Sequence, residues 1–180
     1  MTQPESSKSA AAASKPETET HLNVHVLDEQ SDVELDMERY WRLATSVLTG
    51  EGVTQISELS ITFVSADSIA ALNEQHMGHE GPTDVLAFPI DEHSSQSPDL
   101  AGSPLLLGDV IICPLVAADN CSTNKGSYPG HEGSLTDEID LLVVHGILHV
   151  LGMDHADDGE RHQMQERERD HLAEFVGRNL

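Results

Sequence analysis

Hydrophobic and polar positions alternate with a period of two over residues 22–27, which is typical of a half-buried strand. Three further runs are rich in aliphatic, β-branched and aromatic residues and are bounded by Gly, Pro or polar loops. These runs predict strands at residues 59–64, 84–90 and 105–112. The chain therefore contains enough strand-forming segments for a small sheet.

Apolar residues spaced by three and four positions predict helices between these strands. The first helix should end near Gly50 and Gly52, and its apolar face is formed by Met37, Trp41, Ala44, Val47 and Leu48. A second follows Asp67, which we expect to cap it, and stops at Gly78. A short helix is expected after Cys113. Two longer helices are predicted, one between Thr136 and Gly152 and an amphipathic one over residues 159–175.

Strands and helices are mixed along the chain without an internal repeat, which favours an α+β fold with a mixed sheet packed with helices. The length of 180 residues suits a single domain. Residues 1–20 hold almost no large apolar side chain, so we expect a disordered N-terminal tail before a domain over residues 21–180. The loops over residues 91–104 and 120–134 are polar.

The acidic composition bears on which partners the protein is expected to bind. The formal net charge is −23, which repels polyanions at long range and does not by itself suggest a nucleic-acid enzyme. A membrane span and an export signal are not expected, so a cytoplasmic protein is predicted. Cys113 and Cys121 are then expected to be reduced thiols rather than a disulfide.

Three histidines lie close together in the segment HGILHVLGMDH. His145 and His149 are four residues apart on a predicted helix, so their Cβ atoms lie roughly 6 Å apart on one face. Gly152 can end that helix in a left-handed conformation and let His155 turn back toward the same point. Six other histidines are interpreted as ordinary surface or core residues: His21, His25, His93, His131, His162 and His171.

Three imidazoles with a vacant fourth position for water are the usual ligand set of catalytic zinc. A structural zinc, with Cys113 or Cys121 as fourth ligand, and a site without metal remain alternatives. A metallopeptidase of the HExxH type has its glutamate directly after the first histidine, where this chain has Gly146. The pattern therefore indicates a metal-dependent hydrolase other than an ordinary zinc peptidase.

The histidine segment resembles the signature HGxLHLxGxDH of the bacterial YbeY endoribonucleases. Two upstream blocks are also similar to that family: LNEQHMGHEGPTDVLAFPID at residues 72–91 and LLGDVIICP at residues 106–114. The resemblance covers most of the chain from residue 21 to residue 172 in the same order.

This resemblance implies a four-stranded mixed sheet and one catalytic Zn²⁺ per chain, held by His145, His149 and His155. It implies cleavage of single-stranded RNA rather than DNA in the cytoplasm, maturation of the 3′ end of 16S ribosomal RNA on the small subunit, and ribosome quality control. Zinc would polarise a phosphodiester oxygen and activate water, although attack by the ribose 2′-OH is a rival route.

Two positions depart from the family pattern. Family members often carry an arginine in the first block that is thought to meet phosphate, and this chain has Met77 in that region. The usual serine of TDVLSFP is Ala87. Possible substitutes for the missing polar groups are His76, His79, Arg39, Arg42 or an arginine of the last helix.

Three aspartates have two interpretations each. Asp154 could orient a metal-binding imidazole or could bond the backbone where the helix ends. Asp84 and Asp109 could serve the site or could form hydrogen bonds at a strand end. The function hypotheses are a zinc-dependent endoribonuclease, a zinc hydrolase with a non-RNA substrate, and a non-catalytic ribosome-assembly factor.

Overall fold

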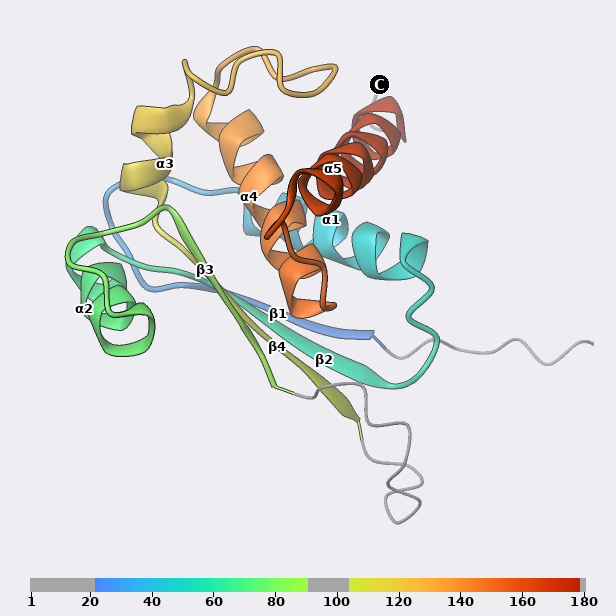
Figure 1. The fold of residues 1–180 in the computed structure, drawn as a ribbon, viewed down its shortest axis with the longest axis horizontal. Helices are drawn as coiled ribbons and strands as arrows, with labels where there is room; N and C mark the ends of the chain where they lie inside the picture. The colour runs from blue at the N-terminus through green and yellow to red at the C-terminus, as the bar shows by residue number, and fades with distance from the viewer. Residues whose placement is uncertain (1–21, 91–103, 179–180) are drawn as a thin grey trace, which may run out of the picture.

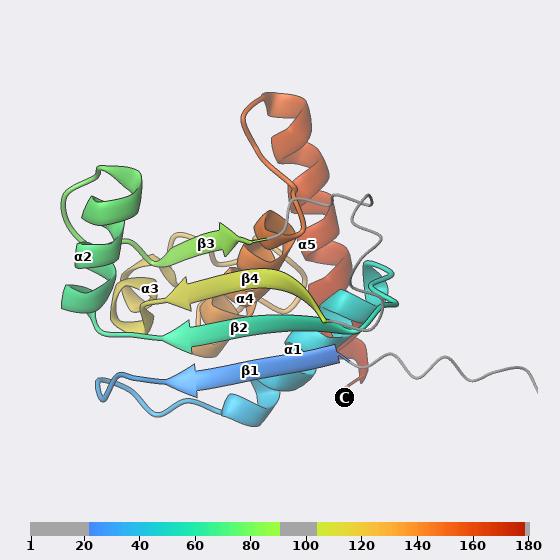
Figure 2. The same cartoon turned by 90° about the horizontal axis from the view of Figure 1, so that it is seen from below.

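The protein folds around one mixed β-sheet. The computed structural model describes residues 22–90 and 104–178, and within these ranges it has four strands and five helices. The strands are β1 (Leu22–Asp28), β2 (Ser57–Phe63), β3 (Val85–Pro89) and β4 (Leu105–Ile112). They are ordered β1-β2-β4-β3, with β1, β2 and β4 parallel and β3 antiparallel to β4 (Figure 2). This arrangement confirms the predicted α+β class and mixed sheet.

The expected helices are all present. They are α1 (Met37–Gly50), α2 (Ala66–Met77), α3 (Pro114–Asn120), α4 (Leu135–Val150) and α5 (Asp158–Arg178). Helices α1, α4 and α5 lie on one side of the sheet (Figure 1), where α1 packs on β1 and α4 packs on β3 and β4. Helix α2 packs near the end of β2, where Ile69 joins a small buried cluster with Leu86 and Cys113. The result is a single domain.

Two helix starts differ from the sequence prediction. The hydroxyl of Ser65, not the carboxylate of Asp67, caps α2 by accepting a hydrogen bond from the backbone N–H of Ser68. Helix α4 begins earlier than expected because Ser134 and Asp137 form a reciprocal capping box. Both corrections have the same cause: a serine in extended conformation at the residue before each helix can reach the third amide of the first turn.

The inner face of α1 also differs from the prediction. Trp41 is exposed, whereas Tyr40 and Leu43 are buried. The Tyr40 ring packs against the ring of Phe63 from β2, with 5.1 Å between their centroids. This contact with β2 determines which face of α1 is turned inward. The spacing of apolar residues alone could not tell whether Tyr40 or Trp41 lies on that face.

Helix α4 is the central element of the fold. Its side chains are buried over most of its circumference, and it contacts α1, α3, α5, β3 and β4. A helix that is apolar nearly all round is stable only when other elements cover it, which explains the run DLLVVHGILHV. Because it is enclosed, α4 presents its last two turns at a fixed position beside β3.

A buried ion pair joins α1 to α4. Arg39 donates hydrogen bonds from Nε to both carboxylate oxygens of Asp140, at 3.0 and 3.2 Å. The side chain of Asp140 is 1% exposed. Burial raises the pKa of this carboxyl group, and the hydrogen bond and charge of Arg39 oppose that shift. The guanidinium also lies 5.3 Å from the ring centroid of Phe175, so it connects α5 as well.

The segment between α3 and α4 is held by a second buried polar cluster. The carboxylate of Glu138 bonds His131 at 3.1 Å and accepts a hydrogen bond from the Asn124 amide at 2.7 Å. His131 and Glu138 are both buried. The prediction that His131 is an ordinary residue did not include this role, which fixes the polar loop before α4.

Some predictions fall outside the described residues. These are the disordered tail over residues 1–20 and nearly all of the polar loop over residues 91–104. Both cysteines are free and buried, as expected for reduced thiols. In the described ranges, none of the helices combines the length and apolar character needed to cross a membrane.

Candidate metal centre

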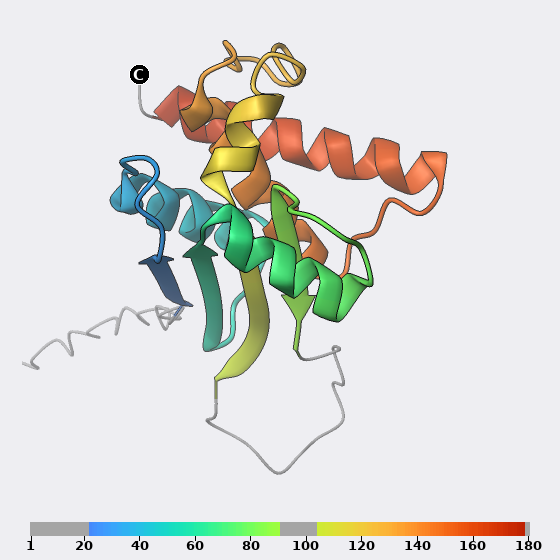
Figure 3. The ribbon, with the colours of Figure 1, turned by 90° about the vertical axis from the view of Figure 1, so that its left-hand side faces the viewer.

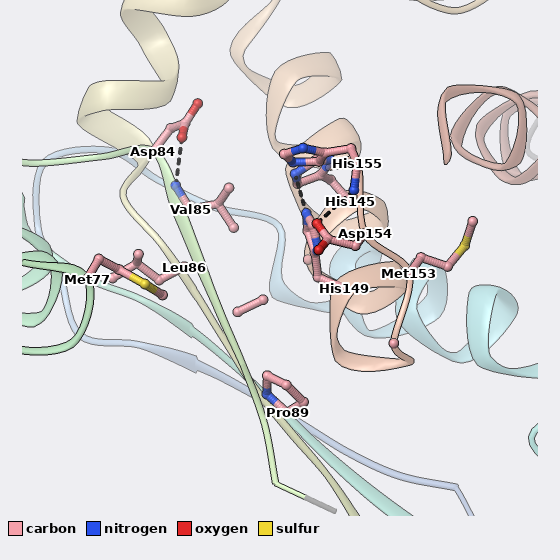
Figure 4. A pocket seen from close by; sticks show the side chains of 13 residues that line it. Met77, Asp84, Val85, Leu86, Pro89, His145, His149, Met153, Asp154 and His155 are labelled. Atoms are coloured by element: carbon pink, nitrogen blue, oxygen red, sulfur yellow. Dashed lines mark hydrogen bonds between the residues drawn. The ribbon is translucent and has the colours of Figure 1, made fainter. Parts of the chain in front are cut away.

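The three motif histidines converge at the end of α4. His145 and His149 project from its last two turns, one helical turn apart. The helix ends at Val150 with Leu151 as its C-cap, and Gly152 adopts a φ of +93°, which L-residues with side chains rarely adopt. The chain then reverses and places His155 beside the other two imidazoles (Figure 4). The predicted helix stop and return are therefore both present.

The distances between the imidazoles suit a single metal ion. The Nε2 atoms of His145 and His149 are 3.2 Å apart. Tetrahedral zinc with Zn–N bonds of about 2.05 Å requires neighbouring nitrogens roughly 3.3 Å apart. One nitrogen from each of the three histidines lies within 4.8 Å of the others. The donor set and its spacing are therefore compatible with a metal site.

A carboxylate from α5 orients the first histidine. Glu168 Oε1 lies 2.8 Å from Nδ1 of His145, and its side chain is 12% exposed. This contact favours the tautomer with hydrogen on Nδ1, which leaves the Nε2 lone pair directed toward His149 and His155. Metal-binding histidines usually have such a partner. Sequence reasoning missed Glu168 because only the tertiary fold brings it to α4.

Burial also adjusts His149 for metal binding. The pKa of His149 is lowered, first by burial and then by the neighbouring His145 and His155. A lowered pKa keeps the imidazole neutral at physiological pH, and the neutral form is the one that donates its lone pair to a metal.

An open cavity of about 570 Å³ lies over the three histidines. One wall is formed by the end of α4 and the turn that follows it, and the opposite wall by β3 with Met77 at the end of α2 (Figure 4). The lining from β3 includes Val85, Leu86, Ala87 and Pro89. Such an open, largely apolar cleft over convergent polar groups has the form of a substrate site.

Comparison with known proteins identifies the family. The family model for endoribonuclease YbeY matches residues 24–176, nearly all of the described chain. The chain belongs to the YbeY family.

Several YbeY relatives are similar over most of their length. The endoribonuclease YbeY of Thermobifida fusca is 42% identical over 152 residues, which cover 84% of this chain and 93% of that protein. The endoribonuclease YbeY of Saccharopolyspora erythraea is also 42% identical, over 156 residues covering 86% and 81% respectively. The solution structure of TM1509 from Thermotoga maritima is 25% identical and superposes with a TM-score of 0.54 over 86% of this chain and 90% of that one.

The fold explains why the YbeY motif here has glycine after its first histidine. A Cβ atom on Gly146 would lie 2.4 Å from Cγ1 of Val110, well below van der Waals contact. Glycine therefore permits the close packing of α4 on β4. The glutamate of zinc peptidases would not fit at this position, so its absence is a consequence of the packing.

Of the remaining predicted site residues, some line the cavity and others do not. Asp154 lines the cavity, but its carboxylate accepts a hydrogen bond from the backbone N–H of His155 at 2.7 Å, which is the local interpretation. His76 packs edge-on against Phe88, with ring centroids 5.1 Å apart. Neither His76 nor His79 is among the residues that line the cavity. The catalytic role of Asp154 and the substrate-binding roles of His76 and His79 stay predictions.

Asp84 shows strand-end hydrogen bonding. Its carboxylate accepts from the backbone N–H of Val85 and from the side-chain amide of Asn120, each at 2.9 Å. Asp84 also lines the cavity, whereas Asp109 does not. Asp84 therefore joins the start of β3 to the end of α3 and helps to position the wall opposite the histidines.

Replacing Glu168 with glutamine is expected to weaken zinc binding by about 10-fold, and replacing it with alanine by about 100-fold. Glutamine keeps a hydrogen-bond acceptor for His145 but lacks the charge that makes the imidazole a stronger donor. Competition with a chromophoric chelator measures the affinity. Glu166→Gln is the matched control, because that side chain is 58% exposed and pairs with His162. Equal zinc affinity of the wild-type protein, both Glu168 variants and the Glu166→Gln control would contradict the role of Glu168.

Proposed function

We propose that this YbeY-family protein is a zinc-dependent endoribonuclease that cuts single-stranded RNA. The observation that carries the proposal is the convergence of His145, His149 and His155 beneath an open cleft. The second support is the match to a family of endoribonucleases over residues 24–176. By the same relationship we infer a role in ribosomal RNA maturation, including the 3′ end of 16S RNA, and in ribosome quality control.

The residues fit one zinc ion per chain. Three neutral imidazole nitrogens are typical of catalytic zinc, which leaves the fourth position for water or substrate. Bound zinc would supply Lewis-acid chemistry by polarising the phosphodiester and acidifying water. A closed structural site is less well supported, because Cys113 and Cys121 are buried in the packing of α3 and not among the cavity residues.

The chain's own residues would bind and orient the substrate. Glu168 holds the His145 ring, Gly152 and Asp154 shape the turn that returns His155, and β3 provides an apolar wall. Asp84 and Asp154 are the carboxylates in the cavity lining, and each already accepts backbone hydrogen bonds. Neither is an obvious general base. A 2′,3′-cyclic phosphate on the product would therefore indicate attack by the ribose 2′-OH.

One observation favours a second candidate, a non-catalytic ribosome-assembly factor. The residues lining the larger cavity, all in the described ranges, include no lysine or arginine. With a net charge of −23, the protein must overcome general repulsion of RNA.

A zinc hydrolase acting on a non-RNA substrate is the other alternative. We propose a cytoplasmic location and the small ribosomal subunit as partner, with no role at membranes or on DNA.

The proposed activity is tested with a set of matched substrates. Zinc-loaded protein should cut a single-stranded RNA internally, and should cut the same sequence poorly as a duplex or as DNA. The apolar side chains of β3 beside the histidines can contact the faces of unpaired bases, which a duplex keeps stacked inside. RNA binding without metal-dependent cutting would instead support the assembly factor. Equal cleavage of all three substrates would contradict the proposed specificity.

A further inference from the structure

A second cavity lies on the other side of the histidine cluster. Its volume is about 230 Å³, and its lining consists of His145, His155, Arg161, Met164, Gln165 and Glu168. His145 and His155 also line the larger cavity. The two cavities therefore meet at the candidate metal site, and a chain-like substrate that crosses this site can extend into both.

The two cavities differ in their charged residues. The larger one contains Asp84 and Asp154 and, within its described lining, no lysine or arginine. The smaller one contains Arg161 together with one carboxylate, Glu168, which is bonded to Nδ1 of His145. A phosphodiester chain lying only in the larger cavity would thus meet carboxylates and no basic side chain.

Helix α5 determines where Arg161 lies. Arg161, Gln165 and Glu168 follow one another at steps of four and three residues, so they share one face of the helix. The contact of Glu168 with His145 shows that this face is turned toward the metal site. The first turns of α5, which carry Arg161, project beyond the sheet (Figure 3). Arg161 lines the smaller cavity, and its side chain is 55% exposed.

Among the described residues, Arg161 forms a single ion pair, and this pair is weak. Its Nη1 lies 3.3 Å from Oδ1 of Asp158, and both side chains are more than half exposed, at 55% and 101%. Exposed pairs of this kind contribute little stability, so the guanidinium can turn toward a phosphate at low cost. Other arginines have structural contacts: Arg39 with Asp140, Arg167 with Glu51, and Arg169 with the carbonyl of Ser127.

We propose that the smaller cavity is a phosphate subsite in which Arg161 binds an RNA phosphodiester next to the one that is cut. The inference rests on the proposed endoribonuclease function and deepens it. Guanidinium groups bind phosphate oxygens through two parallel hydrogen bonds, and Gln165 provides a further amide donor at the same wall. RNA then runs from the apolar cleft beside β3, across the histidines, to the first turns of α5.

The test measures binding separately from cleavage. Zinc-loaded full-length protein is titrated with a fluorescein-labelled single-stranded 2′-O-methyl oligonucleotide across a KCl series, and anisotropy gives the affinity. Arg161→Ala should weaken binding by about 10-fold and reduce the magnitude of the log–log salt slope by about 0.7, the value for one phosphate contact on a single strand. Arg161→Lys should retain part of the affinity, because lysine keeps the charge but loses the paired donors.

Arg42 was also a possible substitute on sequence grounds, but the structure places it at an exposed position on α1 that lines neither cavity. Arg42→Ala is therefore the matched control, because it removes the same charge away from both cavities. Equal affinity and equal salt slopes for the Arg42 and Arg161 variants would overturn the subsite, even if the wild-type protein cuts RNA. Loss of binding in Arg161→Ala alone would support the subsite even if no RNA is cut, in which case only the proposed activity fails. No measurable binding by the wild-type protein would overturn the subsite as well.

Discussion

Replacing His149 with alanine is expected to remove bound zinc and to lower the rate of RNA cleavage by about 1000-fold or more. A Lewis-acid metal contributes several kcal/mol of transition-state charge stabilisation. Each 1.4 kcal/mol or so corresponds to a factor of ten in rate, so losing about 4 kcal/mol gives the predicted effect. His149 lies between the other two proposed ligands in sequence, and its Nε2 atom is 3.2 Å from Nε2 of His145. Two remaining imidazoles would hold zinc poorly.

The control for this variant is His162→Ala. His162 lies on α5 with its side chain 68% exposed and pairs with Glu166, away from both cavities. Zinc content and cleavage should match wild type in that protein, and thermal unfolding should confirm that both variants are folded. Cleavage by His149→Ala at the wild-type rate would show that the histidine cluster is not the active site.

Replacing Arg39 with alanine is expected to lower the free energy of unfolding by about 3–5 kcal/mol, the usual effect of leaving a buried charge without its partner. The carboxylate of Asp140, 1% exposed, would remain in the interior between α1 and α4. Denaturant unfolding measures the effect. Arg42→Ala on the same helix is the control, and it should change stability by less than about 0.5 kcal/mol.

The pH dependence of this loss has a definite sign. Burial raises the pKa of Asp140, and removing Arg39 takes away the interaction that opposes this shift. A carboxyl group with a raised pKa in the folded state favours folding when protonated, and its stabilising contribution is lost as pH rises through that pKa. The deficit of Arg39→Ala relative to wild type should therefore be smaller near about pH 5 than near about pH 8.

The double replacement of Arg39 by methionine and Asp140 by leucine should recover most of the lost stability, because it leaves no charge unpaired. A stability of Arg39→Ala equal to that of Arg42→Ala at every pH would contradict the structural role assigned to the ion pair.

The sequence predicted the elements well where a periodic pattern has a direct physical cause. Alternation at residues 22–27 and the β-branched run at residues 59–64 correspond to β1 and β2, because one face of β1 is half-buried and one face of β2 is buried. The ligand cluster was predictable because His145, His149 and His155 are close in sequence and Gly152 determines the turn between them.

Contacts between distant segments were not predictable in this way. Glu168 lies 23 residues after His145 on an amphipathic helix with several other acidic residues, so no spacing distinguishes it. Arg39 and Asp140 are 101 residues apart. Arg161 is one of several arginines on the last helix, and only the position of α5 beside the histidines places it in the smaller cavity.

The most direct test of the central claim is a zinc titration of metal-free protein, followed by the rate of single-stranded RNA cleavage. We predict no cleavage without metal and a rate that rises with added zinc until it levels off at one equivalent per chain, as the three-histidine cluster implies. A cleavage rate that is the same with and without zinc would contradict the account.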